Sequence, residues 1–303
     1  MQRDFNHNYC DLSVIVPVSN MAGRLESFFN WIVNTSDYPI EVIVVHDKHD
    51  DATGKELREL LNLIANPKVF LLEGNYNGPG GARNAGLELA SAEWISFWDS
   101  DDSINLEQVF SNLRSKAVFS AEIIIGGFTV LDQKYGKTTQ QEISLEKSKA
   151  LVDVALNPGL WRMQFRKNLV KSIRFQELYM GEDQLFLTDL QIWSKRIFFI
   201  SNSGYTYHKN RPGQLTLNRT KVNELILATK VLTGQFFQFP SNLKLYDLII
   251  LVRQILTILV HAKIRIKIEA IRILLRMSFN AILSRDKRFF KAIHIVLWYR
   301  IKI

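Results

Sequence analysis

Three carboxylates lie within four residues in Asp99-Ser100-Asp101-Asp102, directly after the apolar run 94–98. Because that run has the composition of a buried strand, we expect the carboxylates at the carboxyl end of a strand, where open α/β sheets bind ligands. Like charges this close repel one another, and a divalent cation such as Mg²⁺ or Mn²⁺ would relieve the repulsion. The alternative is a solvated turn in which Asp102 or Ser103 caps a helix starting at Leu106. The cluster alone leaves both interpretations open.

A glycine-rich segment at 77–86 reads Asn-Gly-Pro-Gly-Gly-Ala-Arg-Asn-Ala-Gly and precedes an expected helix. Glycines let the backbone approach a ligand closely, and free amides at a helix N-terminus favour phosphate. The spacing matches neither the P-loop nor the G-x-G-x-x-G pattern, so it supports neither of those nucleotide-binding folds. A flexible loop that starts a helix remains the alternative.

The elements that must position these residues alternate between strands and helices in the first half of the chain. The apolar runs predict strands at 12–18, 40–45, 69–72 and 94–98, and the helical patterns lie at 21–34, 53–65 and 82–90. Such alternation predicts an α/β fold with a mostly parallel sheet that helices flank on both faces.

Beyond residue 106 the pattern is less regular. We expect a strand at 123–125, a hairpin from 128–131 to 137–139, helices at 145–156, 159–170 and 186–194, and short strands at 197–200 and 204–208. After Arg219 the chain is rich in Leu, Ile, Lys and Arg, which indicates helices.

The composition indicates an intracellular globular protein. The 303 residues are 47% apolar, enough for one large domain with an appendage. The single cysteine, Cys10, excludes an internal disulfide and fits a reducing compartment. The N-terminus lacks an apolar signal-peptide core, and no apolar run reaches the roughly 18 residues that span a bilayer. We therefore expect a cytoplasmic location.

Positive charge is concentrated in the last quarter of the chain. Residues 221–303 hold 15 Lys and Arg against 4 Asp and Glu, a net of +11, whereas the rest of the chain has a net of −3. We therefore predict a catalytic body over 1–220 and a basic helical extension over 221–303.

Helical spacing separates two stripes between residues 263 and 283 of this extension. One is apolar (Ile264, Ile268, Ile271, Leu275, Phe279) and the other is mostly basic (Arg265, Glu269, Arg272, Arg276). This pattern favours contact of residues 244–303 with an anionic membrane, and helices packed on the body with a solvated basic face are the alternative. Nucleic acid is not an expected partner, because the aromatic residues do not interleave with the charges.

Four segments taken together resemble the family 2 glycosyltransferases of the GT-A fold, in that family's order and approximate spacing: 13–20, 42–47, 77–87 and 99–102. The resemblance covers about residues 12–215. It implies an inverting, metal-dependent enzyme that moves a hexosyl or N-acetylhexosaminyl group from a nucleotide-sugar, with UDP-sugar preferred, to a glycan or lipid-linked glycan. The implied setting is bacterial capsule, lipopolysaccharide or exopolysaccharide synthesis, peripheral on the inner face of the plasma membrane.

The resemblance also implies roles for individual residues. Asp101, Asp102 and His208 would hold Mg²⁺ or Mn²⁺, and Asp183 would be the catalytic base with Glu182 in support. Asp47 would contact the nucleobase, and Trp161 would stack on the acceptor sugar unless it is simply a core residue. The remaining donor-binding residues would be Pro17, Asn77, Gly81, Arg83, Asp99, His208 and Arg211. For Glu182 and Asp183 an acidic helix start is the alternative, and for His208 and Arg211 the polar end of a surface strand.

One segment departs from the family pattern. Where the family has two aspartates followed by Gly-Ser, this chain has His46-Asp47-Lys48-His49, although Asp51-Ala52-Thr53 keeps the end of the motif. Recognition of the nucleobase is therefore open, and His46 has the alternative of a strand-end side chain facing the sheet edge.

Two other classes of function remain to be weighed. A nucleotidyltransferase would carry a glycine- and lysine-rich loop after the first strand, and Val18-Ser19-Asn20-Met21 is not such a loop. A catalytically silent sugar-nucleotide-binding protein is disfavoured because the acidic cluster and Glu182-Asp183 occur together.

Overall fold

The computed structural model describes residues 10–211, 222–238 and 243–302. It forms two compact units. Unit 1 comprises Met1–Ile143, Leu160–Arg174 and Arg196–Arg211, and unit 2 comprises Ser144–Gly159, Phe175–Lys195 and Pro212–Ile303. The predicted boundary between residues 220 and 221 lies outside the described part of the chain, and unit 2 also contains two segments that precede it.

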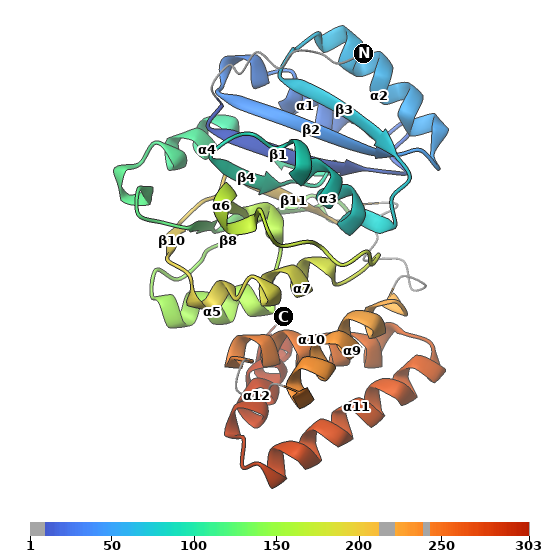
Figure 1. Cartoon of the computed structure of the whole chain (residues 1–303), viewed down its shortest axis with the longest axis vertical. Helices are drawn as coiled ribbons and strands as arrows, with labels where there is room; N and C mark the ends of the chain where they lie inside the picture. Colours follow the sequence, from blue (N-terminus) through green and yellow to red (C-terminus); the bar gives the residue numbers. More distant parts are fainter. Residues whose placement is uncertain (1–9, 212–221, 239–242, 303) are drawn as a thin grey trace. The chain divides into compact units, whose positions relative to one another are not determined.

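A seven-stranded sheet forms the centre of unit 1 (Figure 1). The strand order is β10 (Ile197–Ile200), β6 (Ile123–Gly126), β9 (Met163–Arg166), β4 (Trp94–Phe97), β1 (Leu12–Val18), β2 (Ile40–Asp47) and β3 (Val69–Gly74). All neighbours are parallel except β9, which is antiparallel to both β4 and β6. The predicted mostly parallel sheet, with its first four strands, is confirmed.

Helices cover both faces of this sheet. Alternate residues of β1, from Leu12 to Val18, share a buried apolar cluster with α1 (Glu26–Ile32), α2 (Asp51–Ile64) and α4 (Leu106–Leu113). The opposite face of β1 packs on α3 (Gly78–Leu89). Burial on both faces explains why these strands are almost continuously apolar.

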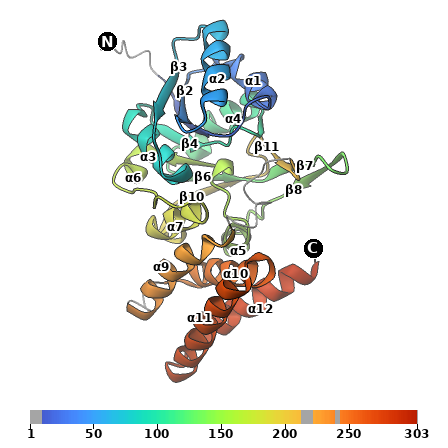
Figure 2. The ribbon, with the colours of Figure 1, turned by 90° about the vertical axis from the view of Figure 1, so that its right-hand side faces the viewer.

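A second, four-stranded sheet in unit 1 has the order β5 (Ser103–Ile104), β11 (Tyr205–Lys209), β7 (Phe128–Asp132) and β8 (Lys137–Gln141). The predicted hairpin is confirmed as β7–β8, which extends away from the larger sheet (Figure 2). The two-residue β5 was not predicted. Its pairing with β11 brings the segment after the acidic cluster beside Tyr205 and Thr206.

The helix predicted over 159–170 is wrong. Only the four-residue α6 (Lys167–Val170) is α-helical there, after the 3₁₀ turn η3 (Leu160–Arg162). Between them, β9 fills the gap between β4 and β6, where Met163 and Phe165 are fully buried. Pairing with strands distant in sequence outweighs the local helical pattern at this position. The other 3₁₀ turns are η1 (Thr35–Asp37), η2 (Lys116–Val118) and η4 (Ile192–Ser194).

Unit 2 is helical. Its helices are α5 (Lys147–Leu156), α7 (Glu182–Asp189), α9 (Leu225–Gln238), α10 (Leu245–His261), α11 (Ile264–Leu283) and α12 (Lys287–Lys302). The most buried is α10, which contacts α5, α9, α11 and α12. The predicted helical C-terminal extension is thus confirmed for 222–238 and 243–302. Among the described helices, none combines the length and apolarity needed to cross a bilayer.

Candidate active site

The candidate site lies at the edge of unit 1 where the parallel strands β1 to β4 end. Register places Val18 of β1 opposite His46 of β2, and Asp47 of β2 opposite Gly74 of β3. The loops that follow these strands therefore meet at one edge, the usual ligand position in open α/β sheets. Pro17 is half-buried one residue before the end of β1.

Asp47 ends β2 beside two exposed residues, Lys48 and His49. One Asp47 carboxylate oxygen accepts hydrogen bonds from the His49 main-chain N–H (3.2 Å) and lies 2.6 Å from His49 Nδ1. Tyr76 also lies close by: burial and the charge of Asp47 raise the pKa of its phenol. Its ring covers Gly74, where an added Cβ would lie 2.6 Å from the Tyr76 hydroxyl oxygen. Sequence reasoning missed Tyr76, although an aromatic residue directly before the glycine-rich segment was a usable signal.

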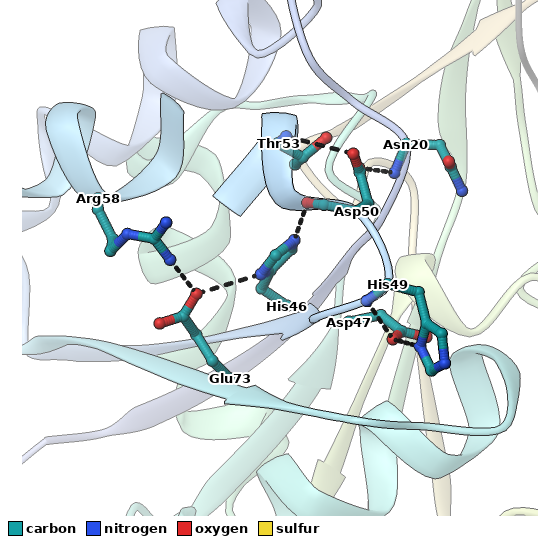
Figure 3. A network of polar contacts seen from close by, with 8 residues as sticks. All are labelled: Asn20, His46, Asp47, His49, Asp50, Thr53, Arg58 and Glu73. Carbon is teal, nitrogen blue, oxygen red and sulfur yellow. Dashed lines mark hydrogen bonds and ion pairs between the residues drawn. The ribbon is translucent and has the colours of Figure 1, made fainter. Parts of the chain in front are cut away.

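His46 is buried beneath the loop that follows β2 (Figure 3). Its Nε2 lies 2.9 Å from the main-chain oxygen of Asp50, which can only accept, so Nε2 carries a proton. Nδ1 lies 3.3 Å from the carboxylate of Glu73, which also pairs with Arg58 at 2.5 Å. An added Cβ on Gly54 of α2 would be 2.6 Å from His46 Cε1. The ring is thus enclosed by β3 and α2.

Asp50 fastens the loop after β1 to the start of α2 (Figure 3). Its carboxylate caps α2 by accepting from Thr53 N (3.3 Å) and also accepts from Asn20 N (2.6 Å). Burial opposes ionisation of Asp50, but the hydrogen bonds from Thr53 and Asn20 outweigh it and lower the pKa. Thr53 Oγ1 accepts from Met21 N at 2.8 Å. These bonds fix the first two loops of the edge against each other.

The glycine-rich segment forms the first two turns of α3, with Asn77 at the N-cap and Pro79 in the first turn. Gly81 and Arg83 are buried in the helix. The guanidinium of Arg83 lies 3.2 Å from the Asp99 carboxylate, which ties α3 to the acidic cluster. The predicted donor residues at 83 and 99 are therefore brought together.

Asp102 is fully buried at the back of the acidic cluster. Its oxygens accept from the Tyr205 hydroxyl (2.6 Å) and from the His208 main-chain N–H (2.7 Å). Burial, together with the charges of Asp101 and Asp99, raises its pKa well above the usual value. The alternative interpretation, a helix cap at Asp102 or Ser103, is wrong, because the side chain of Asn105 caps α4 by accepting from Gln108 N at 3.0 Å.

The His208 ring is also nearly buried. Its Nδ1 faces the amide nitrogen of Gln133 (3.2 Å), which can only donate, and its Nε2 faces Ser103 Oγ (3.0 Å). This arrangement fits a neutral ring with the proton on Nε2. Burial, and to a smaller extent Arg211, lowers its pKa in agreement. Both nitrogens are engaged, so His208 would have to turn its ring to bind a metal.

Asp101 lies beside Asp99 and close to the arginines Arg24 and Arg211. Burial and the neighbouring Asp99 raise its pKa to about 6, although Arg211 and Arg24 lower it in part. The Arg211 guanidinium donates to the main-chain oxygen of Asp101, to Ser27 Oγ (3.1 Å) and to the Arg24 main-chain oxygen (3.2 Å). Of these two arginines, Arg211 was predicted from the sequence, whereas Arg24 was not.

The carboxylates fit a divalent cation. Burial and the neighbouring Asp99 disfavour the ionised form of Asp101, which a nearby cation would offset, and oxygen is the ligand that Mg²⁺ and Mn²⁺ prefer. In the described part of the chain, no three His, Cys, Asp or Glu side chains converge into a complete metal site. Proteins commonly bind Mg²⁺ through one or two carboxylates together with phosphate oxygens and water.

Trp161 lies in an aromatic cluster of unit 1. Its ring stacks on Tyr205 (4.6 Å between centroids, 18° between planes) and on Tyr207 (5.6 Å, 1°). It also makes an edge-to-face contact with Phe128, with 4.6 Å between the ring centroids. These contacts explain its position without a glycan. Its acceptor role stays a prediction.

Glu182 and Asp183 belong to unit 2, whereas the other predicted site residues belong to unit 1. They form the first turn of α7, and Asp183 accepts from the Gln184 main-chain N–H at 2.8 Å. The preceding Gly181 has a φ of +88°, and an added Cβ would lie 2.8 Å from Ala228 Cβ. The structure thus fixes the helix start, and the role of Asp183 as base stays a prediction.

Similarity to known proteins bears on the same residues. The sequence model of glycosyl transferase family 2 matches residues 13–178, more than half of the chain. The chain belongs to glycosyltransferase family 2. This confirms the predicted family, and the matched range includes the carboxyl edge of β1–β4 and the acidic cluster.

Curated relatives of the chain are bacterial glycosyltransferases. The poly(ribitol-phosphate) β-N-acetylglucosaminyltransferase TarS of Staphylococcus aureus (strain Mu50) is 33% identical over 216 residues, which cover 67% of this chain and 36% of TarS. The GalNAc(5)-diNAcBac-PP-undecaprenol β-1,3-glucosyltransferase of Campylobacter jejuni is 29% identical, covering 69% of this chain and 68% of the relative. Glycosyltransferase GlyA of Streptococcus pneumoniae is 25% identical, with coverages of 68% and 31%. The chain thus spans about a third of the length of TarS and GlyA.

Solved structures share the fold. The crystal structure of S. aureus TarS 1-349 in complex with UDP-GlcNAc has a TM-score of 0.56 at 22% identity, and the match covers 96% of this chain and 92% of that chain. The mannosyltransferase PcManGT from Pyrobaculum calidifontis, in complex with GDP-Man and Mn²⁺, has a TM-score of 0.54 at 14% identity, with coverages of 97% and 87%. The predicted GT-A fold is confirmed.

Proposed function

We propose that this chain is an inverting, metal-dependent glycosyltransferase that uses a UDP-sugar. The observation that carries the proposal is the arrangement of Asp99 and Asp101 with Arg83, Arg24 and Arg211 at the carboxyl edge of the family's sheet. Carboxylates that hold a cation, beside guanidinium groups that bind phosphate, suit a nucleoside diphosphate.

The chain's own residues would divide the work as follows. Asp101, with Asp99, would hold the cation, and Asp102, anchored by Tyr205 and the main chain of His208, would keep the segment in place. When bound, Mg²⁺ or Mn²⁺ supplies Lewis-acid stabilisation of the leaving diphosphate. Asp47 and Tyr76 receive the uracil, one as hydrogen-bond acceptor and the other as an aromatic face. Lys48 and His49, which depart from the family pattern, lie exposed beside Asp47 and would adjust how tightly the base is held.

Asp183 would remove the proton from the acceptor hydroxyl, with Glu182 in support, and the hydroxyl would displace the diphosphate in one step. Inversion at the anomeric carbon follows from that single displacement. The acceptor we propose is a glycan or lipid-linked glycan of bacterial cell-surface polysaccharide, with the enzyme on the cytoplasmic face of the membrane. The undecaprenol-linked substrate in the name of the Campylobacter relative supports this choice.

The test is a panel of nucleotide-sugars incubated with the purified chain and Mn²⁺, Mg²⁺ or EDTA, with released nucleoside diphosphate as the readout. We expect UDP release from one or two UDP-sugars, abolished by EDTA. Release of pyrophosphate from a nucleoside triphosphate plus a sugar phosphate would instead identify a nucleotidyltransferase.

A further inference from the structure

Helix α11 of unit 2 carries a continuous line of exposed apolar side chains. Six large residues are 44–74% exposed: Ile264, Ile268, Ile271, Leu275, Phe279 and Ile282. Their spacing of three or four residues places them within one narrow stripe that runs about 27 Å along the helix. Burying such side chains is favourable, so an unpartnered stripe of this length indicates a binding surface.

The stripe is not the side by which α11 packs within unit 2. The residues of α11 that are buried are Ala270, Met277 and Ala281, which lie on the opposite side of the helix. Helices α9, α10 and α12 contact α11. The helix is therefore held by a face of small residues and one methionine, while its largest apolar side chains point away from the unit's core.

Basic residues border the stripe on one side. Arg265, Arg272 and Arg276 are exposed and follow the same helical spacing about 80° around the axis. The acidic residue of α11, Glu269, is paired with Lys230 at 2.6 Å, and Asp286 after the helix is paired with Arg288 at 2.7 Å. Ion pairs thus offset the negative charges of this segment, and the arginines leave it strongly positive.

We propose that α11 is a membrane-docking helix that lies in the plane of an anionic bilayer, with this stripe inserted among the acyl chains and its arginines at the headgroup phosphates. An apolar stripe beside a basic one is the pattern of interfacial helices. Charge complementarity favours an anionic lipid surface over a second copy of this chain, because two copies would bring like charges together. The inference deepens the membrane part of the proposed function by naming the helix, its orientation and the lipid class.

Co-sedimentation of the full chain with lipid vesicles tests binding. We expect partition into vesicles containing phosphatidylglycerol and little into pure phosphatidylcholine, with high salt releasing only part of the protein. Ile271→Glu/Leu275→Glu should lower the partition coefficient at least roughly tenfold. The matched control is Leu63→Glu/Phe119→Glu, which makes the same charge change at residues 83% and 87% exposed in unit 1, and it should bind as the wild type does.

A labelling scan tests orientation and keeps the proposal falsifiable if the double variant fails to fold. An environment-sensitive fluorophore would be attached to one cysteine at a time in a Cys10→Ser background, using the variants Ile268→Cys, Ile271→Cys, Arg272→Cys, Leu275→Cys and Arg276→Cys. We expect blue-shifted emission on anionic vesicles at 268, 271 and 275, and much smaller shifts at 272 and 276.

Equal shifts at all five positions, or equally negligible binding to both vesicle types, would overturn the proposal. So would a dimer in solution that Ile271→Glu/Leu275→Glu dissociates, because the stripe would then be an interface between copies. Neither assay needs a nucleotide-sugar, so failure here and failure of the transferase proposal are separate results.

Discussion

The His46 ring packs against Gly54, so the effect of Gly54→Ala on the free energy of unfolding should change sign when that ring is removed. A methyl group added at Gly54 would lie 2.6 Å from His46 Cε1 and 3.1 Å from Nδ1. The ring is 1% exposed and its nitrogens face Asp50 and Glu73, so it has little room to move. Overpacking of this kind costs about 1–3 kcal/mol.

Alanine is otherwise better than glycine in a helix, by up to about 1 kcal/mol. We therefore expect Gly54→Ala to lower the free energy of unfolding by about 1–2 kcal/mol in the wild-type chain. In a His46→Ala background, where the ring is absent, the same change should raise it by up to about 1 kcal/mol. The coupling energy between the two sites is then about 1–3 kcal/mol, in the range found for residues in contact.

Urea denaturation of the four chains in this cycle measures the coupling. The matched control is Gly234→Ala in α9, where an added Cβ meets nothing within 4 Å, and that variant should be stabilised or unchanged. If Gly54→Ala stabilises the wild type as much as it stabilises His46→Ala, the His46 ring does not pack against α2, and its enclosure between β3 and α2 is incorrect.

Three further predictions concern single carboxylates. Asp101→Asn should abolish metal-dependent UDP-sugar turnover with an unchanged circular dichroism spectrum, and full wild-type activity in excess EDTA would remove the metal role. Asp183→Asn should keep UDP affinity while turnover falls roughly 10²-fold or more, the scale of general-base loss; normal turnover would make Asp183 a helix-start residue only. Asp247 of α10 has its pKa raised to about 6, chiefly by burial, so its protonated form is the one the fold favours. The stability it contributes is present below pH 4 and lost as pH rises through 6, by about 3 kcal/mol at 1.36 kcal/mol per pH unit. Asp247→Asn should remove this pH-dependent loss of stability. If the unfolding free energies of the wild type and of Asp247→Asn change in parallel with pH, the prediction is wrong.

The strands at the centre of the fold were predictable because burial on both faces makes them apolar throughout. The start of α1 was not. A helix was expected from Met21, but it begins at Glu26, because the intervening loop is held by α2 through Asn20, Met21 and the Gly23 N–H, which donates to Glu56 at 2.7 Å. Those partners lie about thirty residues away, where local periodicity carries no information about them.

The candidate site shows the same limit. The acidic cluster and Arg83 could be named from their types and spacing, and the structure brings Arg83 to Asp99. The surroundings of His46 and His208 could not be named, because Glu73, Gln133 and Ser103 reach them only through strand pairing. Side-chain type therefore located the chemistry, whereas the fold was needed to distinguish Asp102, which is anchored by Tyr205 and His208, from Asp101, which lies beside Asp99 and two arginines.

The measurement closest to the central claim is calorimetric titration of UDP into the chain in Mn²⁺, which needs neither the sugar nor the acceptor to be known. The account predicts binding that EDTA removes and that Asp99→Asn/Asp101→Asn weakens at least roughly tenfold, the loss expected when charged partners of a phosphate-bound cation are neutralised. The control is Asp132→Asn/Glu146→Asn, which removes the same amount of charge. Asp132 is half-buried in unit 1 and Glu146 is exposed in unit 2, and this variant should bind UDP as the wild type does. Absence of UDP binding in any metal, or equal binding by both double variants, would contradict the placement of the donor at this edge.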